Sequence, residues 1–115
     1  MRVIVCGSRD WHDRARISDR LADLPGTSTV VQGGAKGADR IALQEAQKLG
    51  LLVETHDADW STYGKRAGLI RNTGMAEFGA DLCIAFWDGR STGTYHMMGE
   101  AMKYGIPVEV VMKRR

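Results

Sequence analysis

Five short runs of apolar residues, rich in valine and isoleucine, alternate along the chain with longer segments of mixed polarity. The runs predict strands over residues 2–6, 29–32, 51–55, 82–87 and 107–112, and apolar residues on both faces are typical of strands in a parallel sheet. Between the strands, apolar residues recur at helical spacing and predict helices over about 12–24, 38–49, 64–78 and 94–104. The order βαβαβαβαβ predicts an α/β fold, in which one domain over residues 1–115 has a five-stranded parallel sheet with helices on both faces.

The predicted third helix is unusual because it contains Gly64, Gly68 and Gly74. Each glycine inside a helix costs up to about 1 kcal/mol relative to alanine. Two explanations are open: either another group packs very close to this helix, or its N-terminal half is irregular.

Composition and charge limit the class of protein. The 115 residues suffice for one domain with a hydrophobic core. The 16 basic and 14 acidic residues give a net charge of +2, which is too balanced to indicate a nucleic-acid surface by itself, and we do not expect a nucleic-acid partner. Cys6 and Cys83 lie inside apolar runs and are expected to be buried thiols, which suit a reducing compartment. The strand pattern begins directly after Met1 and no apolar run reaches membrane-spanning length. We therefore expect no signal peptide, no membrane association and a cytoplasmic location.

The unusual residues gather at one edge of the predicted sheet. In doubly wound sheets, ligands bind at the carboxyl ends of the strands, near the point where strand order reverses. The stretches after the first four predicted strands are glycine-rich, polar or both: residues 7–9, 33–39, 56–60 and 87–94. The opposite edge carries ordinary turn residues such as Pro25, Gly26 and Gly105. We expect the functional site at the carboxyl edge.

The stretch Gly33-Gly34-Ala35-Lys36-Gly37-Ala38-Asp39 joins the second predicted strand directly to a helix. Glycines let backbone N–H groups approach a ligand, the helix N-terminus adds partial positive charge, and Lys36 adds a full charge, so the pattern is typical of a phosphate-binding loop. The alternative is a tight strand-to-helix turn without a ligand. Asp39 is expected to interact with the helix dipole in the first turn rather than with a ribose.

A second glycine loop, residues 88–94, opens the fourth helix. Two such loops at helix N-termini indicate two anionic groups, or one phosphate held from both sides. Ser91, Thr92 and Thr94 supply hydroxyl groups, either as ligand donors or as helix caps. Arg9 and Arg90 are suited to forked contacts with phosphate oxygens.

Two further features point to the same edge. Trp11, Trp60 and Trp87 each lie at or just beyond the end of a strand, where an aromatic ring either stacks on a nucleobase or covers the sheet; we expect the second role for at least two of them. Arg71 lies seven residues after Gly64 and Asn72 four after Gly68, which places polar groups on a glycine face of the third helix, although a solvated surface arginine is the alternative.

His12, His56 and His96 are scattered, and mid-strand burial argues against reactive cysteines, so we expect neither a metal nor a cofactor.

In these motifs the chain resembles the SLOG superfamily of Rossmann-like nucleotide-binding proteins, and within it the small YspA-like, YpsA-related branch. The residues that carry the resemblance are Gly7-Ser8-Arg9, residues 33–39, Trp60, Gly64-Lys65, Ala67-Gly68, Arg71-Asn72, residues 86–89, Ser91, Gly93 and Thr94. The resemblance implies a nucleotide or nucleotide-derived ligand in the crevice. Together with the patterns above, it gives a set of ligand- and phosphate-binding residues: Gly7, Ser8, Arg9, Gly33, Gly34, Lys36, Gly37, Asp39, Arg71, Asn72, Asp88, Gly89, Ser91, Thr92, Gly93 and Thr94.

The same superfamily includes the "lonely guy" phosphoribohydrolases, whose pattern pairs an Arg-Lys-x-x-Met helix with a Pro-Gly-Gly-x-Gly-Thr-x-Glu loop. Arg71 and Met75 match the helix, but His96 stands where the loop has its catalytic glutamate, and Glu100 lies one turn further along. A carboxylate that stabilises positive charge on the ribose is therefore missing from its expected place.

These observations support three hypotheses. The first is a sensor or sequestering domain that binds a nucleotide-derived ligand and self-associates. The second is a nucleotide N-glycoside hydrolase that uses Arg71 with His96 or Glu100. The third, weaker hypothesis is single-stranded nucleic-acid binding, because DNA-processing proteins also occur in the superfamily.

Overall fold

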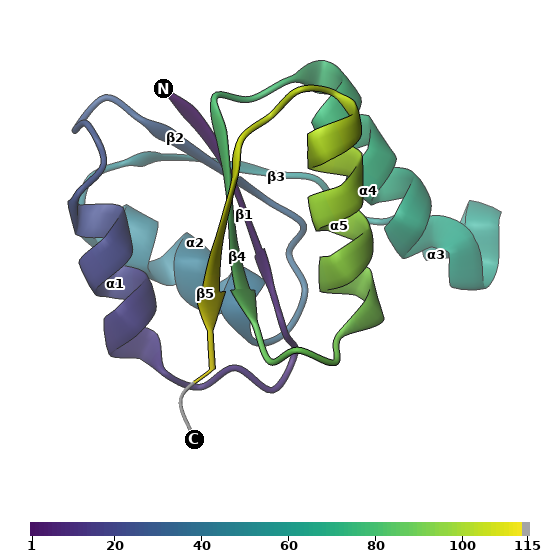
Figure 1. Ribbon diagram of the computed structural model, residues 1–115, viewed down its shortest axis with the longest axis horizontal. Coiled ribbons are helices and arrows are strands. Elements are labelled where there is room, and N and C mark those ends of the chain that lie inside the picture. Colours follow the sequence, from purple (N-terminus) through teal and green to yellow (C-terminus); the bar gives the residue numbers. More distant parts are fainter. Residues whose placement is uncertain (114–115) are drawn as a thin grey trace.

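The sheet has the predicted number of strands, and all of them run parallel. A computed structural model of the protein describes residues 1–113. Its strands are β1 (Arg2–Gly7), β2 (Thr29–Gln32), β3 (Leu52–Thr55), β4 (Leu82–Trp87) and β5 (Val108–Met112). They form one parallel sheet in the order β3-β2-β1-β4-β5, seen nearly edge-on in Figure 1. The prediction of a five-stranded parallel sheet is confirmed.

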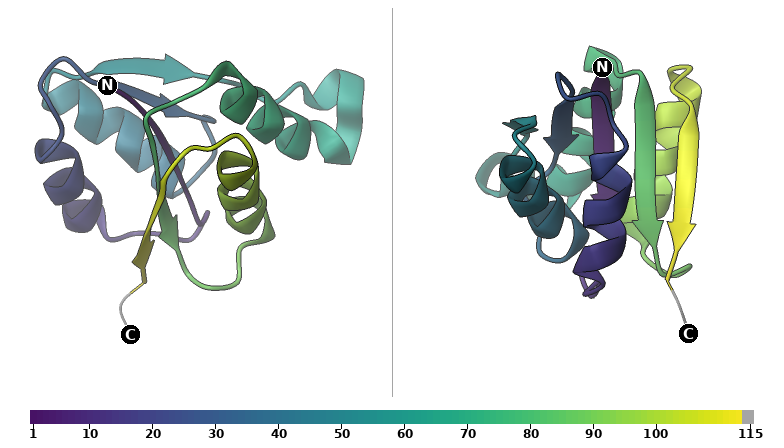
Figure 2. Two further views of the ribbon diagram at one scale, coloured as in Figure 1. Left: turned by 45° about the horizontal axis from the view of Figure 1, so that its top comes forward. Right: turned by 90° about the vertical axis from the view of Figure 1, so that its left-hand side faces the viewer.

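Helices cover both faces of this sheet, as Figures 1 and 2 show. One face carries α1 (Arg14–Ala22) and α2 (Ala38–Lys48), and the other carries α4 (Ala67–Phe78) and α5 (Thr92–Lys103). Alternate side chains of β1 supply the two cores: Val3 and Val5 pack with α1 and α2, whereas Ile4 and Cys6 pack with α4 and α5. The central strands are thus buried on both sides, which explains their uninterrupted apolar sequences.

The expected burial of the two thiols is confirmed, since Cys6 and Cys83 are both buried and free. A hydrogen bond with Cys83 and the loss of solvent raise the pKa of the Cys6 thiol well above its ordinary value. At neutral pH this thiol is protonated and unreactive.

The third predicted helix is broken. A short helix α3 (Trp60–Tyr63) and a 3-10 turn η1 (Gly64–Arg66) precede α4, and Gly64 has a φ of +58°. A positive φ ends a right-handed helix, so the irregular N-terminal half is the correct explanation of the two offered by the sequence. The expectation that Gly64 and Arg71 share one helix face is wrong for the same reason.

Two other helix boundaries differ from the prediction because of capping side chains. The carboxylate of Asp13 accepts the backbone N–H of Arg16 and starts α1 two residues late. The hydroxyl of Ser91 accepts the N–H of Thr94 and starts α5 two residues early. After β5, Lys113 lies 3.6 Å from Asp10, and residues 114–115 lie outside the described part of the chain. Over residues 1–113, the helices are all too short or too polar to cross a lipid bilayer.

Candidate functional site

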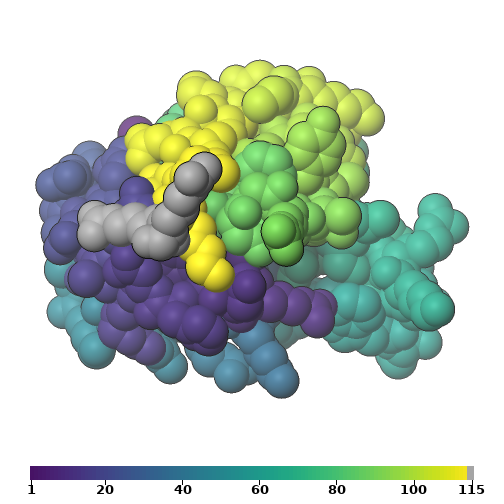
Figure 3. Space-filling model, turned by 60° about the horizontal axis from the view of Figure 1, so that its bottom comes forward, coloured from purple at the N-terminus to yellow at the C-terminus, as the bar shows by residue number. Residues whose placement is uncertain are grey.

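A cavity of about 1190 Å³ lies at the carboxyl edge of the sheet, at the point where strand order reverses between β1 and β4. Figure 3 faces this edge, where the surface is hollowed between the projecting α3 segment and the loop after β4. The cavity is lined by all four stretches expected at this edge and by α4. Among the sequence-predicted residues, those that line it are Gly7, Arg9, Gly33, Gly34, Lys36, Asp39, Trp60, Arg71, Asn72, Asp88, Ser91, Thr92, Gly93 and Thr94. The structure therefore brings the two glycine loops to one place.

The lining is rich in charge of both signs. Its cations are Arg9, Lys36, Arg40, Lys65, Arg71 and Arg90, and its carboxylates are Asp10, Asp39, Asp57 and Asp88. Two of the carboxylates, Asp39 and Asp88, already accept hydrogen bonds from backbone N–H groups. The charge left to meet a ligand is predominantly positive. Among residues 1–113, no three His, Cys, Asp or Glu side chains lie close enough together to hold a metal ion.

The first glycine loop donates its amides internally. The N–H groups of Gly33 and Ala35 point to Oδ2 of Asp39, at 3.2 and 3.4 Å, and the N–H of Gly34 donates to Oε1 of Gln32 at 2.6 Å. This corrects the expectation that the amides of Gly33 and Gly34 form a phosphate cradle. The side chain of Lys36, which is exposed on the cavity wall, remains free to meet an anion.

Asp39 is the carboxylate in the cavity with the most perturbed environment. It lies in the first turn of α2, as expected, but its side chain turns back to the loop and is buried. Desolvation raises the pKa of Asp39 to about 6, against the opposing effects of Arg71 and of the two amides. Oδ2 takes both amide bonds, so Oδ1 is the oxygen available to other partners.

Arg71 holds the loop from the other side. Its Nη1 donates to the carbonyl oxygens of Gly33 at 2.7 Å and His56 at 3.4 Å, and its Nε donates to Oδ1 of Asn72 at 2.9 Å. A Cβ at Gly33 would collide with this guanidinium, so any larger residue there would displace Arg71 from the Gly33 carbonyl. Arg71 is therefore a structural connector as well as a cavity residue, and it is not the solvated surface arginine offered as the alternative.

Asn72 connects α4 to α5. It is buried, and its Nδ2 donates to the carbonyl of Gly93 at 3.3 Å and lies 3.3 Å from Nδ1 of His96. The pair Arg71-Asn72 thus joins the two glycine loops, because one residue holds Gly33 and the next holds Gly93.

The second glycine loop is built around Asp88. Its Oδ1 accepts the N–H groups of Arg90 and Ser91, both at 2.8 Å, and these bonds lower the pKa of Asp88. Ser91 caps α5, and the buried Thr94 hydroxyl lies 2.9 Å from the Ser91 hydroxyl. Ser91 and Thr94 therefore take the capping role that the sequence left open. Thr92 and Gly93, by contrast, are exposed, and in the described part of the chain their N–H groups have no acceptor.

Four predicted ligand residues have other roles. A Cβ at Gly7 would lie 2.5 Å from both the Ala38 Cβ and the Phe86 carbonyl oxygen, so Gly7 permits close packing of β1 even though it borders the cavity. Gly37 caps α2 at a φ of +78° and does not line the cavity. Gly89 also lies off the cavity wall. Ser8 is buried, and its hydroxyl accepts the N–H of Asp88 at 3.1 Å.

Two of the three tryptophans pack against the core of the protein, and the third lines the cavity. Trp11 is 1% exposed and packs edge-on against Phe86, with ring centroids 5.5 Å apart. The indole N–H of Trp87 donates to the carbonyl of Ser91 at 3.0 Å, and its ring packs against the core. Trp60 is 52% exposed and lines the cavity together with Gly68. Among the three, only Trp60 is placed for stacking on a ligand.

His96 and Glu100 lie behind the cavity wall. Oε1 of Glu100 accepts the hydroxyl of Thr73 at 2.6 Å and lies 3.5 Å from Nε2 of His96. Neither residue lines the cavity. The two residues that the sequence offered as replacements for a catalytic glutamate are thus bound to α4.

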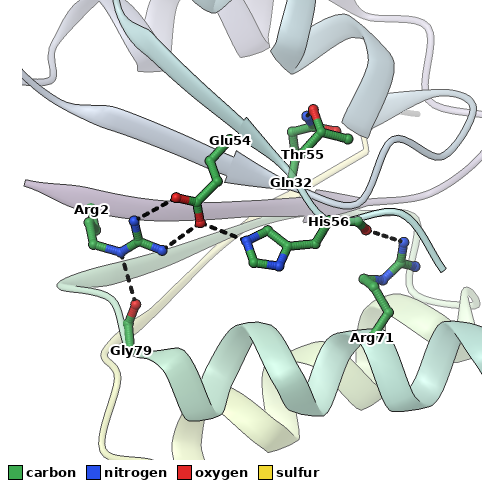
Figure 4. Close-up of polar contacts among 7 residues, drawn as sticks. All are labelled: Arg2, Gln32, Glu54, Thr55, His56, Arg71 and Gly79. Atoms are coloured by element: carbon green, nitrogen blue, oxygen red, sulfur yellow. Dashed lines mark hydrogen bonds and ion pairs between the residues drawn. The ribbon is translucent and has the colours of Figure 1, made fainter. Parts of the chain in front are cut away.

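A polar cluster under α4 was not predicted from the sequence. Both Nη atoms of Arg2 donate to Glu54, at 3.0 and 2.8 Å, and Nε2 of His56 lies 2.6 Å from Oε2 of the same carboxylate. Figure 4 shows this cluster between the sheet and α4, with the His56 carbonyl facing Arg71. The hydrogen bonds from Arg2 and then His56 lower the pKa of Glu54 to about 2. The available signal was the i, i+2 spacing of Glu54 in β3 and His56 just after it, which puts both side chains on one side of an extended chain.

This arrangement can be compared with known proteins. The sequence model of the YspA, cpYpsA-related SLOG family matches residues 1–63. The chain belongs to this SLOG family. It is also 48% identical over 116 residues to the Gene 61 protein of Mycobacterium phage D29, and the match covers 93% of each chain. The resemblance inferred from the sequence is confirmed, and membership of the SLOG family supports a nucleotide-related function in general terms.

Two solved structures have the same fold. DNA processing protein A (DprA) from Streptococcus pneumoniae superposes with a TM-score of 0.83 and 19% identity, over 98% of this chain and 50% of the DprA chain. TM1055 superposes with a TM-score of 0.70 and 18% identity, over 93% of this chain and 71% of that chain. At these identities the likeness shows the fold alone. The SLOG chain spans half the length of the DprA chain.

Proposed function

We propose that the protein binds a nucleotide or nucleotide-derived small molecule in the cavity and acts as a sensor or sequestering domain. The observation that carries the proposal is the N-terminus of the 12-residue helix α5. Thr92 and Gly93 line the cavity there with N–H groups that have no acceptor among residues 1–113. A helix N-terminus of this kind favours negative charge, and Arg90 adds a full positive charge beside it.

The remaining wall suits the rest of a nucleotide. Arg9 and Lys36 are exposed and have no ion-pair partner in the described chain, so they are free to contact further oxygens of a phosphate or a ribose. Trp60 offers an exposed ring on the cavity wall, where a base would stack. Base stacking on an aromatic side chain contributes about 1–3 kcal/mol, enough to orient the ligand.

The direct experiment is to purify the protein under native conditions, denature it and identify by mass spectrometry any small molecule that it releases. Calorimetric titration with the common nucleoside monophosphates then measures affinity. We expect Arg90→Gln to weaken binding about tenfold, because it removes a charge-assisted contact. Arg66→Gln is the matched control, since Arg66 is exposed and does not line the cavity. Absence of any bound or titratable nucleotide would overturn the proposal.

One observation favours N-glycoside hydrolysis as a second candidate function. Asp39 places a buried carboxylate beside Arg71 in the cavity, with one oxygen free of the loop amides. Such a group would stabilise positive charge that develops on a ribose. Water would add to C1′ while the C1′–N bond breaks, and the base would leave with the electron pair and the proton that water releases. Free base formed by the wild type and His96→Ala but not by Asp39→Asn would establish this activity.

A further inference from the structure

A second, smaller hollow of about 400 Å³ adjoins the cavity on the side of α2. It is lined by Trp11, His12, Arg14, Gly37, Ile41 and Gln44, and it shares Arg9, Lys36 and Arg40 with the main cavity. We call this hollow the α2 groove. The three shared cations form the boundary between the two spaces, so a ligand that crosses this boundary would contact all of them.

The charge of the α2 groove is of one sign. Its lining includes four cations, Arg9, Arg14, Lys36 and Arg40, and no carboxylate. Arg14 is neutralised by Glu45, at 2.8 Å. For the other three, no carboxylate within residues 1–113 lies at ion-pair distance. Like charges held together without counter-charge favour the binding of an anion.

The backbone of the α2 groove reinforces this preference. Gly37 caps the 11-residue helix α2 without a side-chain hydrogen bond. The one acidic residue of the first turn, Asp39, is turned away to the amides of Gly33 and Ala35. The positive end of the helix therefore lacks a nearby carboxylate on the groove side.

We infer that the α2 groove is a second phosphate subsite, and that the ligand is a dinucleotide-like molecule with a second phosphate-bearing moiety. This inference rests on the proposed function and deepens it. One nucleotide unit occupies the main cavity, and the linking or second phosphate crosses Arg9, Lys36 and Arg40 into the groove. The modest net charge of +2 and the Arg14–Glu45 pair beside the groove favour a small ligand over a polynucleotide chain.

Nuclear magnetic resonance can observe the two spaces separately. The indole N–H of Trp60 reports on the cavity, whereas the indole N–H of Trp11 and the side-chain amide of Gln44 report on the groove. The probes are 5′-monophosphates and symmetric dinucleoside diphosphates of adenine, guanine, cytosine and uracil. We expect monophosphates to shift the Trp60 signal alone, and at least one diphosphate to shift all three signals and to bind about tenfold more tightly.

A charge variant confined to the groove provides the second test. His12 is exposed, lines only the groove and has no side-chain partner in the described chain, so His12→Glu adds a carboxylate there without breaking a contact. We expect it to abolish the tenfold advantage of the dinucleoside diphosphate and to leave monophosphate binding unchanged. Gln47→Glu is the matched control, because Gln47 is exposed on α2 and lines neither space.

The outcomes separate the two proposals. Shifts of Trp60 without shifts of Trp11 and Gln44 would overturn the groove and leave the proposed function standing. No shift with any probe would overturn both. Tighter binding of oligonucleotides than of dinucleoside diphosphates, with steep salt dependence, would overturn the small-ligand assignment.

Discussion

The carboxylate of Asp39 accepts the backbone N–H of Gly33, at 3.2 Å, six residues back along the chain. The same oxygen accepts the N–H of Ala35, so the carboxylate, and not a ligand, satisfies two amides of the first glycine loop. Together with the bond from Gly34 to Gln32, these bonds hold the first half of the loop against its own side chains. What it presents to the cavity is the cation of Lys36.

This relationship predicts a pH dependence of stability. The pKa of Asp39 in the folded protein is about 6, above the value of about 3.9 in an unfolded chain. The folded state therefore binds this proton more tightly, and its contribution to stability is lost as pH rises from about 4 to about 6. Relative to Asp39→Asn, whose amide oxygen still accepts both N–H groups, the free energy of unfolding of the wild type should fall by about 2 kcal/mol over that interval. Urea denaturation of both proteins at a series of pH values measures it, and parallel curves would contradict it.

A second prediction concerns Arg71 and the same carboxylate. The guanidinium lowers the pKa of Asp39, so its removal should shift the Asp39 titration to higher pH. We expect Arg71→Met to raise the midpoint, observed through the amide signals of Gly33 and Ala35. The variant should also lose about 1–3 kcal/mol of stability because the Gly33 carbonyl loses its donor. Arg66→Met is the control and should leave the Asp39 midpoint unchanged. An Asp39 midpoint in Arg71→Met equal to that of the wild type would refute the coupling.

Glycine substitutions separate stability from binding. A Cβ at Gly74 or Gly93 meets no atom within 4 Å, and both residues lie inside helices. Alanine at either position should stabilise the fold by about 0.5–1 kcal/mol. Gly93→Ala should in addition weaken nucleotide binding several-fold, because its methyl group faces the cavity mouth, whereas Gly74→Ala should not. Thermal denaturation and calorimetry check the two effects, and equal affinities in both variants would argue against phosphate binding at α5.

The cluster under α4 gives a pH dependence of the opposite sign. The pKa of Glu54 is about 2 in the folded protein, below its ordinary value, so its stabilising contribution is present above about pH 4 and is lost as pH falls toward 2. Because the side chain is 35% exposed, solvent screening limits the effect of Glu54→Gln to about 1 kcal/mol at neutral pH. Glu77→Gln, on an exposed residue of α4, is the control for denaturation measured at pH 7 and pH 3. An effect that grows at low pH would exclude the ion pair as its source.

The fold could be predicted from the sequence because its strands are buried on both faces and its turns contain glycine and proline at the opposite edge. The position of the cavity followed from the same pattern, since parallel strands bring their carboxyl ends together. The break in the third helix could be only half anticipated. Three glycines showed that the segment was unusual, but only the positive φ of Gly64 shows where the helix stops.

The internal bonds of the site could not be predicted in the same way. A glycine-rich stretch indicates that the backbone is accessible, but it does not say which acceptor takes its amides. Here Asp39 and Gln32 take them, and that depends on side-chain directions set by tertiary packing. His96 aligned with a catalytic position by sequence, yet it lies against Asn72 and outside the cavity lining.

Ser8 joins three of the segments at the carboxyl edge of the sheet. Its hydroxyl accepts the N–H of Asp88, and its carbonyl accepts the N–H groups of Trp11 and Ala38. One buried residue thus fixes the segments that follow β1, β2 and β4 before any ligand arrives. The conformational entropy of ordering these segments is lost during folding and not during association. Affinity at this edge should therefore depend on the contacts a ligand makes, with little penalty for rearranging the walls around it.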